Sequence, residues 1–244
     1  MRIALLGYGN MGKTIEKIAI ARGHEIVLIH SLEKHNPDWE RQLEKADVAI
    51  EFTAPGAAVE HILACFQAGV PVVVGTTGWY SRLEEVRQTC ESKQAGLFYA
   101  SNFSIGVNLF FRLNRYLAQL MKDYTEYELE MEEIHHIHKK DAPSGTGITL
   151  AEGILAENQR YTSWVNHGNP ESGQIPLISI REDEVPGTHA IRYSSEIDRI
   201  EIVHTAFNRK GFAVGALLAA EFMQGRRGIF TMSDLIQNTP RHGN

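Results

Sequence analysis

The chain has 244 residues, of which 43% are hydrophobic and 22% charged, and its formal net charge is −6 at pH 7. This length allows two modest domains, each with its own core, and the composition excludes a disordered or fibrous protein. The acidic balance, without a long run of lysine and arginine, argues against a nucleic-acid partner.

The first hundred residues alternate short β-branched runs with helical patterns. Helices are predicted over residues 10–21, closing at Gly23, and over 57–68, closing at Gly69, because glycine suits a left-handed helix cap. The strands are predicted over residues 3–6, 25–29, 48–52, 71–74 and 97–99. This alternation predicts an α/β domain with a Rossmann-like parallel sheet.

The pattern changes after residue 103. A long amphipathic helix over residues 104–122 is expected to cross between two domains. Apolar Tyr127, Leu129 and Met131 then alternate with glutamates, which predicts a strand with one solvated face. A helix from about Ser144 is followed by strands over residues 175–180, 189–193 and 200–205, and helices over 212–223 and after 233 end the chain. These elements favour a C-terminal α+β domain with an open mixed sheet.

The chain carries no signal of export or membrane insertion. Arg2 leads directly into a strand-like run, and no stretch approaches 18 consecutive apolar residues. Cys65 and Cys90 lack the spacing of a disulfide framework or a cysteine zinc site. We therefore expect a cytoplasmic protein with no membrane partner.

A glycine-rich loop follows the first predicted strand and opens the first helix, in the sequence Gly7-Tyr8-Gly9-Asn10-Met11-Gly12. This is the GxGxxG fingerprint in the context that dinucleotide binding requires. Gly7 permits the tight turn, Gly9 lets backbone approach a pyrophosphate, and Gly12 lets the helix pack close to the strand. The free helix N–H groups and the helix dipole then face the anion.

The fingerprint also requires an acidic residue about 20 positions further on, for the adenosine ribose. Glu33 lies 21 positions beyond Gly12, and the adjacent Lys34 could meet a 2′-phosphate. The pair therefore predicts tolerance of both NADH and NADPH. The alternative is a solvated ion pair on a surface loop.

Two polar loops follow later predicted strands, where a nicotinamide should lie: Phe52-Thr53-Ala54-Pro55 and Gly75-Thr76-Thr77-Gly78. Their hydroxyls and exposed backbone could bond a carboxamide or ribose. Ordinary strand-to-helix turns would look similar.

The densest cluster of chemically active side chains lies in residues 133–147, whose sequence is EIHHIHKKDAPSGTG. Its histidines are candidate proton donors near neutral pH, and its lysines are cations for carboxylates. Ser144, Gly145 and Thr146 add backbone N–H groups and hydroxyls at a helix start. Together these features favour a small dicarboxylate substrate.

Metal binding is the main alternative for a histidine cluster. Adjacent His135 and His136 on a strand point to opposite faces, no cysteine joins them, and the nearby lysines repel a divalent cation. We therefore expect no metal. A solvated basic turn is the other alternative, and it leaves the helix start that follows unexplained.

Over nearly its whole length the chain resembles the 4-hydroxy-tetrahydrodipicolinate (dihydrodipicolinate) reductase family. The resemblance rests on motifs at residues 7–12, 52–55, 74–78, 100–108, 135–146 and 208–209, with Phe212 and Gly215. It implies reduction of a cyclic imine by NADH or NADPH in lysine and diaminopimelate biosynthesis. It also implies a homotetramer built by the second domain.

The resemblance implies roles for individual residues. His135 would donate the proton, and Lys139 would assist and bind substrate. The substrate carboxylates would be held by His136, Gly145, Thr146 and Arg209. The cofactor would lie on residues 7–12, Glu33, Lys34, Phe52, Thr53, Gly75, Thr76, Thr77, Ala100, Ser101, Asn102 and Phe103, with the nicotinamide near Phe103.

The resemblance also implies a division of the chain. Residues 1–105 and 210–244 would form the dinucleotide-binding domain, and residues 106–209 the substrate-binding and oligomerisation domain. Two alternatives remain open, another two-domain nicotinamide-dependent dehydrogenase and a dinucleotide sensor without turnover.

Overall fold

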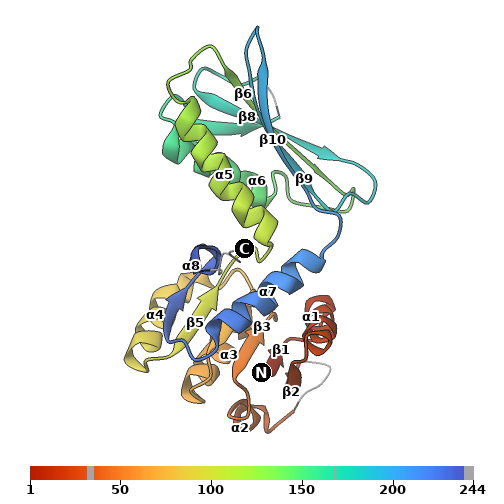
Figure 1. The fold of residues 1–244 in the computed structure, drawn as a ribbon, viewed down its shortest axis with the longest axis vertical. Coiled ribbons are helices and arrows are strands. Elements are labelled where there is room, and N and C mark those ends of the chain that lie inside the picture. Colours follow the sequence, from red (N-terminus) through yellow and green to blue (C-terminus); the bar gives the residue numbers. More distant parts are fainter. Residues whose placement is uncertain (32–35, 168, 239–244) are drawn as a thin grey trace, which may run out of the picture. The chain divides into compact units, whose positions relative to one another are not determined.

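The computed structural model describes residues 1–31, 36–167 and 169–238, and it divides into two compact units. The first unit comprises Met1–Ile105 and the C-terminal segment from Lys210 onward, and the second comprises Gly106–Arg209. The chain thus leaves the first unit once and returns to it (Figure 1).

The first unit is built on a six-stranded parallel sheet in the order β11-β5-β4-β3-β1-β2. The strand order reverses between β1 and β3, which makes that point the topological switch of the sheet. The strands are β1 (Arg2–Leu6), β2 (Glu25–His30), β3 (Val48–Glu51), β4 (Val72–Val74), β5 (Gly96–Tyr99) and β11 (Gly228–Phe230). The predicted Rossmann-like sheet is confirmed, and β11 extends it by one strand.

Helices cover both faces of this sheet (Figure 1), which explains why β3 and β4 are buried at every position. One face packs against α1 (Asn10–Ala21), α7 (Lys210–Met223) and α8 (Met232–Asn238). The other packs against α2 (Trp39–Leu43), α3 (Pro55–Gln67) and α4 (Leu83–Ser92), with a 3₁₀ turn, η1 (Tyr80–Arg82), before α4.

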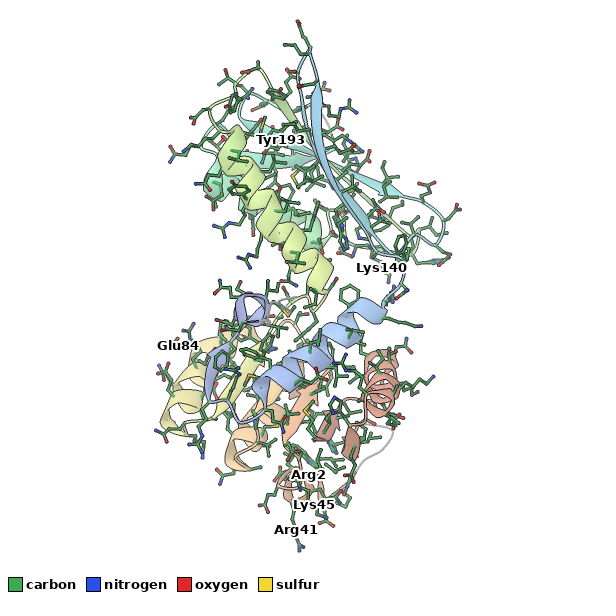
Figure 2. All side chains as sticks on the ribbon, in the orientation of Figure 1. Arg2, Arg41, Lys45, Glu84, Lys140 and Tyr193 are labelled. Carbon is green, nitrogen blue, oxygen red and sulfur yellow. The ribbon has the colours of Figure 1, made fainter. Side chains whose placement is uncertain are left out.

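The second unit holds a mixed five-stranded sheet in the order β10-β9-β6-β8-β7. The strands are β6 (Glu128–His135), β7 (Ser163–Asn166), β8 (Gln174–Arg181), β9 (Thr188–Ser194) and β10 (Arg199–Thr205). Two helices, α5 (Ile105–Met121) and α6 (Gly145–Glu157), contribute apolar side chains to the core over one face of it. Tyr193, labelled in Figure 2, is fully buried in this core.

Strand β6 has the alternating burial that its sequence predicts, with Leu129 and Met131 buried and the intervening glutamates at least partly exposed. The same alternation carries Glu133 and His135 onto the buried face. A carboxylate and an imidazole therefore lie in line with core residues, which prepares the site described below.

The structure corrects one expectation and adds two strands. Helix α5 belongs to the second unit except for Ile105, rather than crossing between the units, because Phe110, Leu117 and Ala118 pack into the core of the second sheet. Strands β7 and β11, of four and three residues, were not predicted from the sequence. No helix in the described part of the chain is both long and apolar enough to span a membrane.

The glycine loop provides a test of this packing. Gly7 has φ +100°, and a Cβ atom there would lie 1.9 Å from the carbonyl oxygen of Phe52. We expect Gly7→Ala to lower the free energy of unfolding by about 2 kcal/mol or more, from backbone strain and overpacking. Gly9→Ala is the matched control, because nothing lies within 4 Å of its Cβ position. Thermal denaturation of both variants checks this, and equal losses would contradict it.

Candidate active site

The loops predicted to bind a dinucleotide all leave the carboxyl ends of parallel strands, so they meet along one edge of the first sheet. Contacts join them in series. The close approach of Gly7 to Phe52 links the loops after β1 and β3. The Thr53 N–H donates to Thr76 Oγ1 at 2.7 Å, and the Phe52 and Phe103 ring centroids lie 5.7 Å apart. The structure therefore brings these predicted residues together.

The glycine loop forms an open cradle at the start of α1. Gly9 is the N-cap residue, and no side chain within the described ranges caps this helix, so its first N–H groups can meet an anion. A cavity of about 390 Å³ opens beside the loop, within the usual size of a cofactor site. Its lining residues are Gly7, Tyr8, Gly9, His30, Ser31, Phe52, Thr53, Ala54, Ala57 and His61. These features fit a dinucleotide.

The predicted cofactor residues differ in whether their side chains are free to contact a cofactor. Phe103 is only 2% exposed and belongs to the core, so its ring supports the edge from within. The Thr76 hydroxyl already accepts from Thr53, whereas Thr77 and Ser101 are exposed. Asn102 Oδ1 accepts from the Ser104 N–H at 2.9 Å. Glu33 and Lys34 lie outside the described residues.

Sequence reasoning missed a buried acid behind this edge. Glu51, the last residue of β3, is fully buried. It accepts hydrogen bonds from the N–H and hydroxyl of Thr53, and His61 Nδ1 lies 3.7 Å from it. An acidic residue that ends an otherwise apolar strand was the available signal. The carboxylate fixes the Thr53 loop, and His61 reaches the cavity wall.

In the second unit, the strand register assembles a polar row beneath α6. Glu133 on β6 is paired with Ser179 on β8 and with His189 on β9, so three neighbouring strands present these side chains to one face. Glu133 is 1% exposed. It accepts hydrogen bonds from the Ser144 N–H at 2.9 Å, the Ser144 hydroxyl at 2.5 Å and the Ser179 hydroxyl at 3.0 Å. Ser144 is the N-cap of α6, so Glu133 holds the helix start against the sheet.

His135 follows two residues later on the same face and is 7% exposed. Its ring centroid lies 5.1 Å from that of His189, and its Nδ1 lies 3.9 Å from Glu133 Oε1. Burial, then the nearby His189, lowers the pKa of His135 to about 4, although Glu133 opposes the shift. Burial raises the pKa of Glu133, but His189 and the two Ser144 donors outweigh it and bring that pKa to about 2.

The loop after β6 carries the predicted cations. Lys139 Nζ pairs with both carboxylate oxygens of Asp141 at 2.8 Å. Arg181 donates to the backbone carbonyls of Lys139 and Asp141, and it lies 3.8 Å from Glu133. Since Arg181 is paired with His135 in the sheet, this arginine links the loop to the buried row. Sequence reasoning missed Arg181, Glu133 and His189.

The remaining predicted residues lie at the ends of this region. Arg209 Nη2 lies 3.3 Å from His136 Nε2. Gly145 and Thr146 form the first turn of α6, directly after the Ser144 cap. The predicted anion-binding groups thus lie around the end of β6 and the start of α6, where a ligand carboxylate could meet both cations and helix N–H groups.

Glu133, His135 and His189 could each offer one atom to a metal ion, since these atoms lie within 4.8 Å of one another. Sequence reasoning considered only neighbouring histidines and missed this cross-strand group. Three hydrogen-bond donors already occupy Glu133, and Lys139 and Arg181 add positive charge nearby. The expected absence of a metal therefore stays a prediction, with these contacts in its favour.

The chain is similar to known reductases over both units. Residues 1–103 match the family model "Dihydrodipicolinate reductase, N-terminus", and residues 106–236 match "Dihydrodipicolinate reductase, C-terminus". The 4-hydroxy-tetrahydrodipicolinate reductase of Christiangramia forsetii is 47% identical over 98% of both chains. That of Methanoregula boonei is 34% identical over 93% of this chain and 94% of its own. A dipicolinate-bound dihydrodipicolinate reductase from Paenisporosarcina sp. TG-14 shares the fold, with TM-score 0.74, 24% identity and coverage of 95% and 97%.

The low pKa of His135 predicts a stability change with pH. Between pH 6.5 and 4 the unfolded chain binds a proton at this histidine and the folded chain does not, so the free energy of unfolding falls as the pH falls. The loss reaches about 3 kcal/mol at pH 4. Chemical denaturation at several pH values measures it, with His135→Gln as control. Burial also lowers the pKa of His204, which is present in both the wild type and His135→Gln and contributes equally to each. If the free energy of unfolding changed with pH by the same amount in both proteins, the prediction would be wrong.

Proposed function

Since the chain belongs to the dihydrodipicolinate reductase family, we propose that it reduces the cyclic imine 4-hydroxy-tetrahydrodipicolinate to tetrahydrodipicolinate with NADH or NADPH, in lysine and diaminopimelate biosynthesis. The observation that carries the proposal is the buried His135 beside a cationic loop and the start of α6, which Ser144 caps by accepting a hydrogen bond from the Gly147 N–H. A chain with only a dinucleotide-sensing role would not need that arrangement.

The cofactor is proposed to lie on the carboxyl edge of the first sheet. Residues 7–12, 52–53, 75–77 and 100–103 would hold it, and the cavity beside the glycine loop supports this placement. When bound, the reduced nicotinamide supplies the hydride. Glu33 and Lys34 are proposed to meet the adenosine ribose and a 2′-phosphate, so we expect both cofactors to be accepted.

The substrate is proposed to be a dicarboxylate held in the second unit. Lys139, His136 and Arg209 would meet its carboxylates, together with the N–H groups of Gly145 and Thr146. Asp141 occupies Lys139 in the structure, so a substrate carboxylate would compete with Asp141 for this ammonium group. The exposure of Asp141 makes that exchange accessible.

His135 is proposed to donate the proton that hydride addition requires. Its low pKa in the free protein leaves it neutral at pH 7. A bound dicarboxylate adds negative charge near the ring and offsets Lys139, so binding favours the protonated form. Lys139 would thus assist the proton transfer as well as bind substrate.

We further propose that residues 1–105 and 210–244 form the dinucleotide-binding domain and that residues 106–209 bind substrate and build a homotetramer. Exposed apolar side chains on and near β10, which pairs with β9 alone in the described sheet, support the assembly. They are Ile197, Ile200, Val203 and Phe207. We expect the enzyme in the cytoplasm, where Cys65 and Cys90, both free and buried, would stay reduced.

Turnover tests the reaction. Purified protein should oxidise NADH and NADPH, followed by absorbance, when the substrate is generated in place by an aldol-condensing synthase. His135→Gln should lower kcat by about 10² to 10⁴-fold, because it removes a placed general acid. Lys139→Met should raise KM, since it removes a carboxylate partner. Prior dialysis against a chelator should leave the rate unchanged.

Each outcome separates the alternatives. Cofactor binding by calorimetry without oxidation in any preparation would favour a sensor. Turnover that survives in His135→Gln would place the proton donor elsewhere. Loss of activity on chelation would favour the alternative of a metal ion bound by Glu133, His135 and His189. Gly9→Ala, which should fold normally, should weaken binding of both cofactors.

Light scattering after size exclusion tests the assembly. Four chains of 27.4 kDa give a mass near 110 kDa. Val203→Glu places a charge on the exposed edge strand and should shift the mass toward smaller species, because burying an unpaired carboxylate opposes association. Ile20→Glu, at an exposed apolar position on α1, is the control. A tetramer that persists in Val203→Glu would exclude β10 from the interface.

A further inference from the structure

We propose that Glu133 is a positioning residue for the proton donor: its buried carboxylate keeps a proton on Nδ1 of His135, so that Nε2 delivers the proton to substrate. This inference rests on the proposed function of His135 and adds a residue that the sequence motifs do not assign. It assigns the nitrogen of His135 that gives up the proton and the residue that fixes the protonation of the other nitrogen.

The geometry of the ring carries the assignment. His135 Nδ1 is fully buried, lies 3.9 Å from Glu133 Oε1, and has no hydrogen-bond partner among the described residues. A Cβ atom at Gly187 would lie 3.1 Å from Nε2, so the glycine leaves space where a side chain would crowd that nitrogen. One nitrogen therefore faces a fixed anion, and the other faces a position kept clear of side-chain atoms.

Proton donation requires the two nitrogens of the ring to have these different surroundings. A neutral imidazole that gave up its only proton would become an imidazolate, so the donor must be the imidazolium, with protons on both nitrogens. During transfer the Nε2–H bond breaks, its electron pair stays on the ring, and a bond to hydrogen forms at the substrate atom that received negative charge from the hydride. The neutral ring keeps Nδ1–H facing Glu133, and a solvent proton restores Nε2–H.

Glu133 is the buried anion that opposes the groups disfavouring a charged imidazole at His135. Those groups are His189 on β9, Lys139 on the loop after β6 and Arg181 on β8. Asp141 is exposed and already paired with Lys139. The Ser144 and Ser179 donors hold the Glu133 carboxylate in place and ionised, so its charge at Nδ1 is constant across neutral pH.

Glu133 also joins the proton donor to the substrate-binding turn. The carboxylate that faces His135 accepts both the backbone N–H and the hydroxyl of Ser144, the cap of α6. A shift of the α6 start therefore moves the same carboxylate that orients the imidazole. The proton donor and the proposed carboxylate-binding turn are thus held in register by one side chain.

Nitrogen NMR of the free protein at pH 7.5 gives a readout that does not need turnover. We expect ¹⁵N-labelled His135, assigned by its loss in His135→Gln, to be in the Nδ1–H form in the wild type and largely Nε2–H in Glu133→Gln. Glu132→Gln is the matched control, because it makes the same change one residue away on the other face of β6, where Glu132 pairs with Arg192. Its His135 signal should match the wild type.

Kinetics give the second readout. In Glu133→Gln we expect kcat to fall about tenfold or more, the alkaline limb of the kcat profile to move to lower pH, and KM to change less than kcat. Glu133→Asp retains the charge and should recover the Nδ1–H form and most of kcat. A merely structural role would lower stability without moving the pH limb.

The outcomes separate this inference from the proposed function. A wild-type His135 in the Nε2–H form overturns the role of Glu133 even if Glu133→Gln does not fold, as does a Glu133→Gln enzyme with unchanged kcat and pH profile. A wild type in the Nδ1–H form supports the orientation. Wild-type protein with that form but no NADH or NADPH oxidation would sink the proposed reaction while leaving the orientation of the ring intact.

Discussion

The hydrogen-bonded carboxylate of Glu133 is the interaction on which the second unit depends. A charge that is 1% exposed is tolerated only when donors replace the water it has lost, and Ser144 and Ser179 supply them. Each such charged hydrogen bond contributes about 1.5–3 kcal/mol to the free energy of unfolding. Loss of one donor leaves the buried carboxylate without a replacement for the water it lost on folding. The start of α6, the register of three strands and the surroundings of His135 are therefore fixed together.

The candidate sites of the two units are made of different chemical groups. The first unit uses backbone at the carboxyl edge of a parallel sheet, where Gly7 has no room for a side chain and Gly9 leaves open space beside the loop. The second unit uses buried side chains whose charges are set by their neighbours. A fold of the first kind can serve many reactions, and the residues that we propose to select this one lie in the second unit.

The sequence predicts the first unit more fully than the second for a physical reason. Strand and helix periods, and the glycine loop, are local patterns, so the edge of the Rossmann-like sheet could be located without coordinates. The row at Glu133 depends on the pairing of β6 with β8 and β9, which brings Ser179 and His189 from 46 and 56 positions away. One local signal did exist: Glu133 is in phase with the apolar Leu129 and Met131, so the alternation itself predicts a buried carboxylate.

If His135 donates the proton as proposed, its burial accounts for an imidazole that is neutral in the free protein and charged once a substrate binds. Burial and the neighbouring His189, Lys139 and Arg181 hold its pKa at about 4, so the imidazole of the free protein is neutral at neutral pH. The low local dielectric that produces this shift also strengthens the effect of any anion that enters. A dicarboxylate is such an anion, whereas a neutral analogue is not. Selection of the substrate and protonation of the donor would then follow from the same charge, with Glu133 ensuring that the incoming proton resides on the nitrogen that faces the substrate.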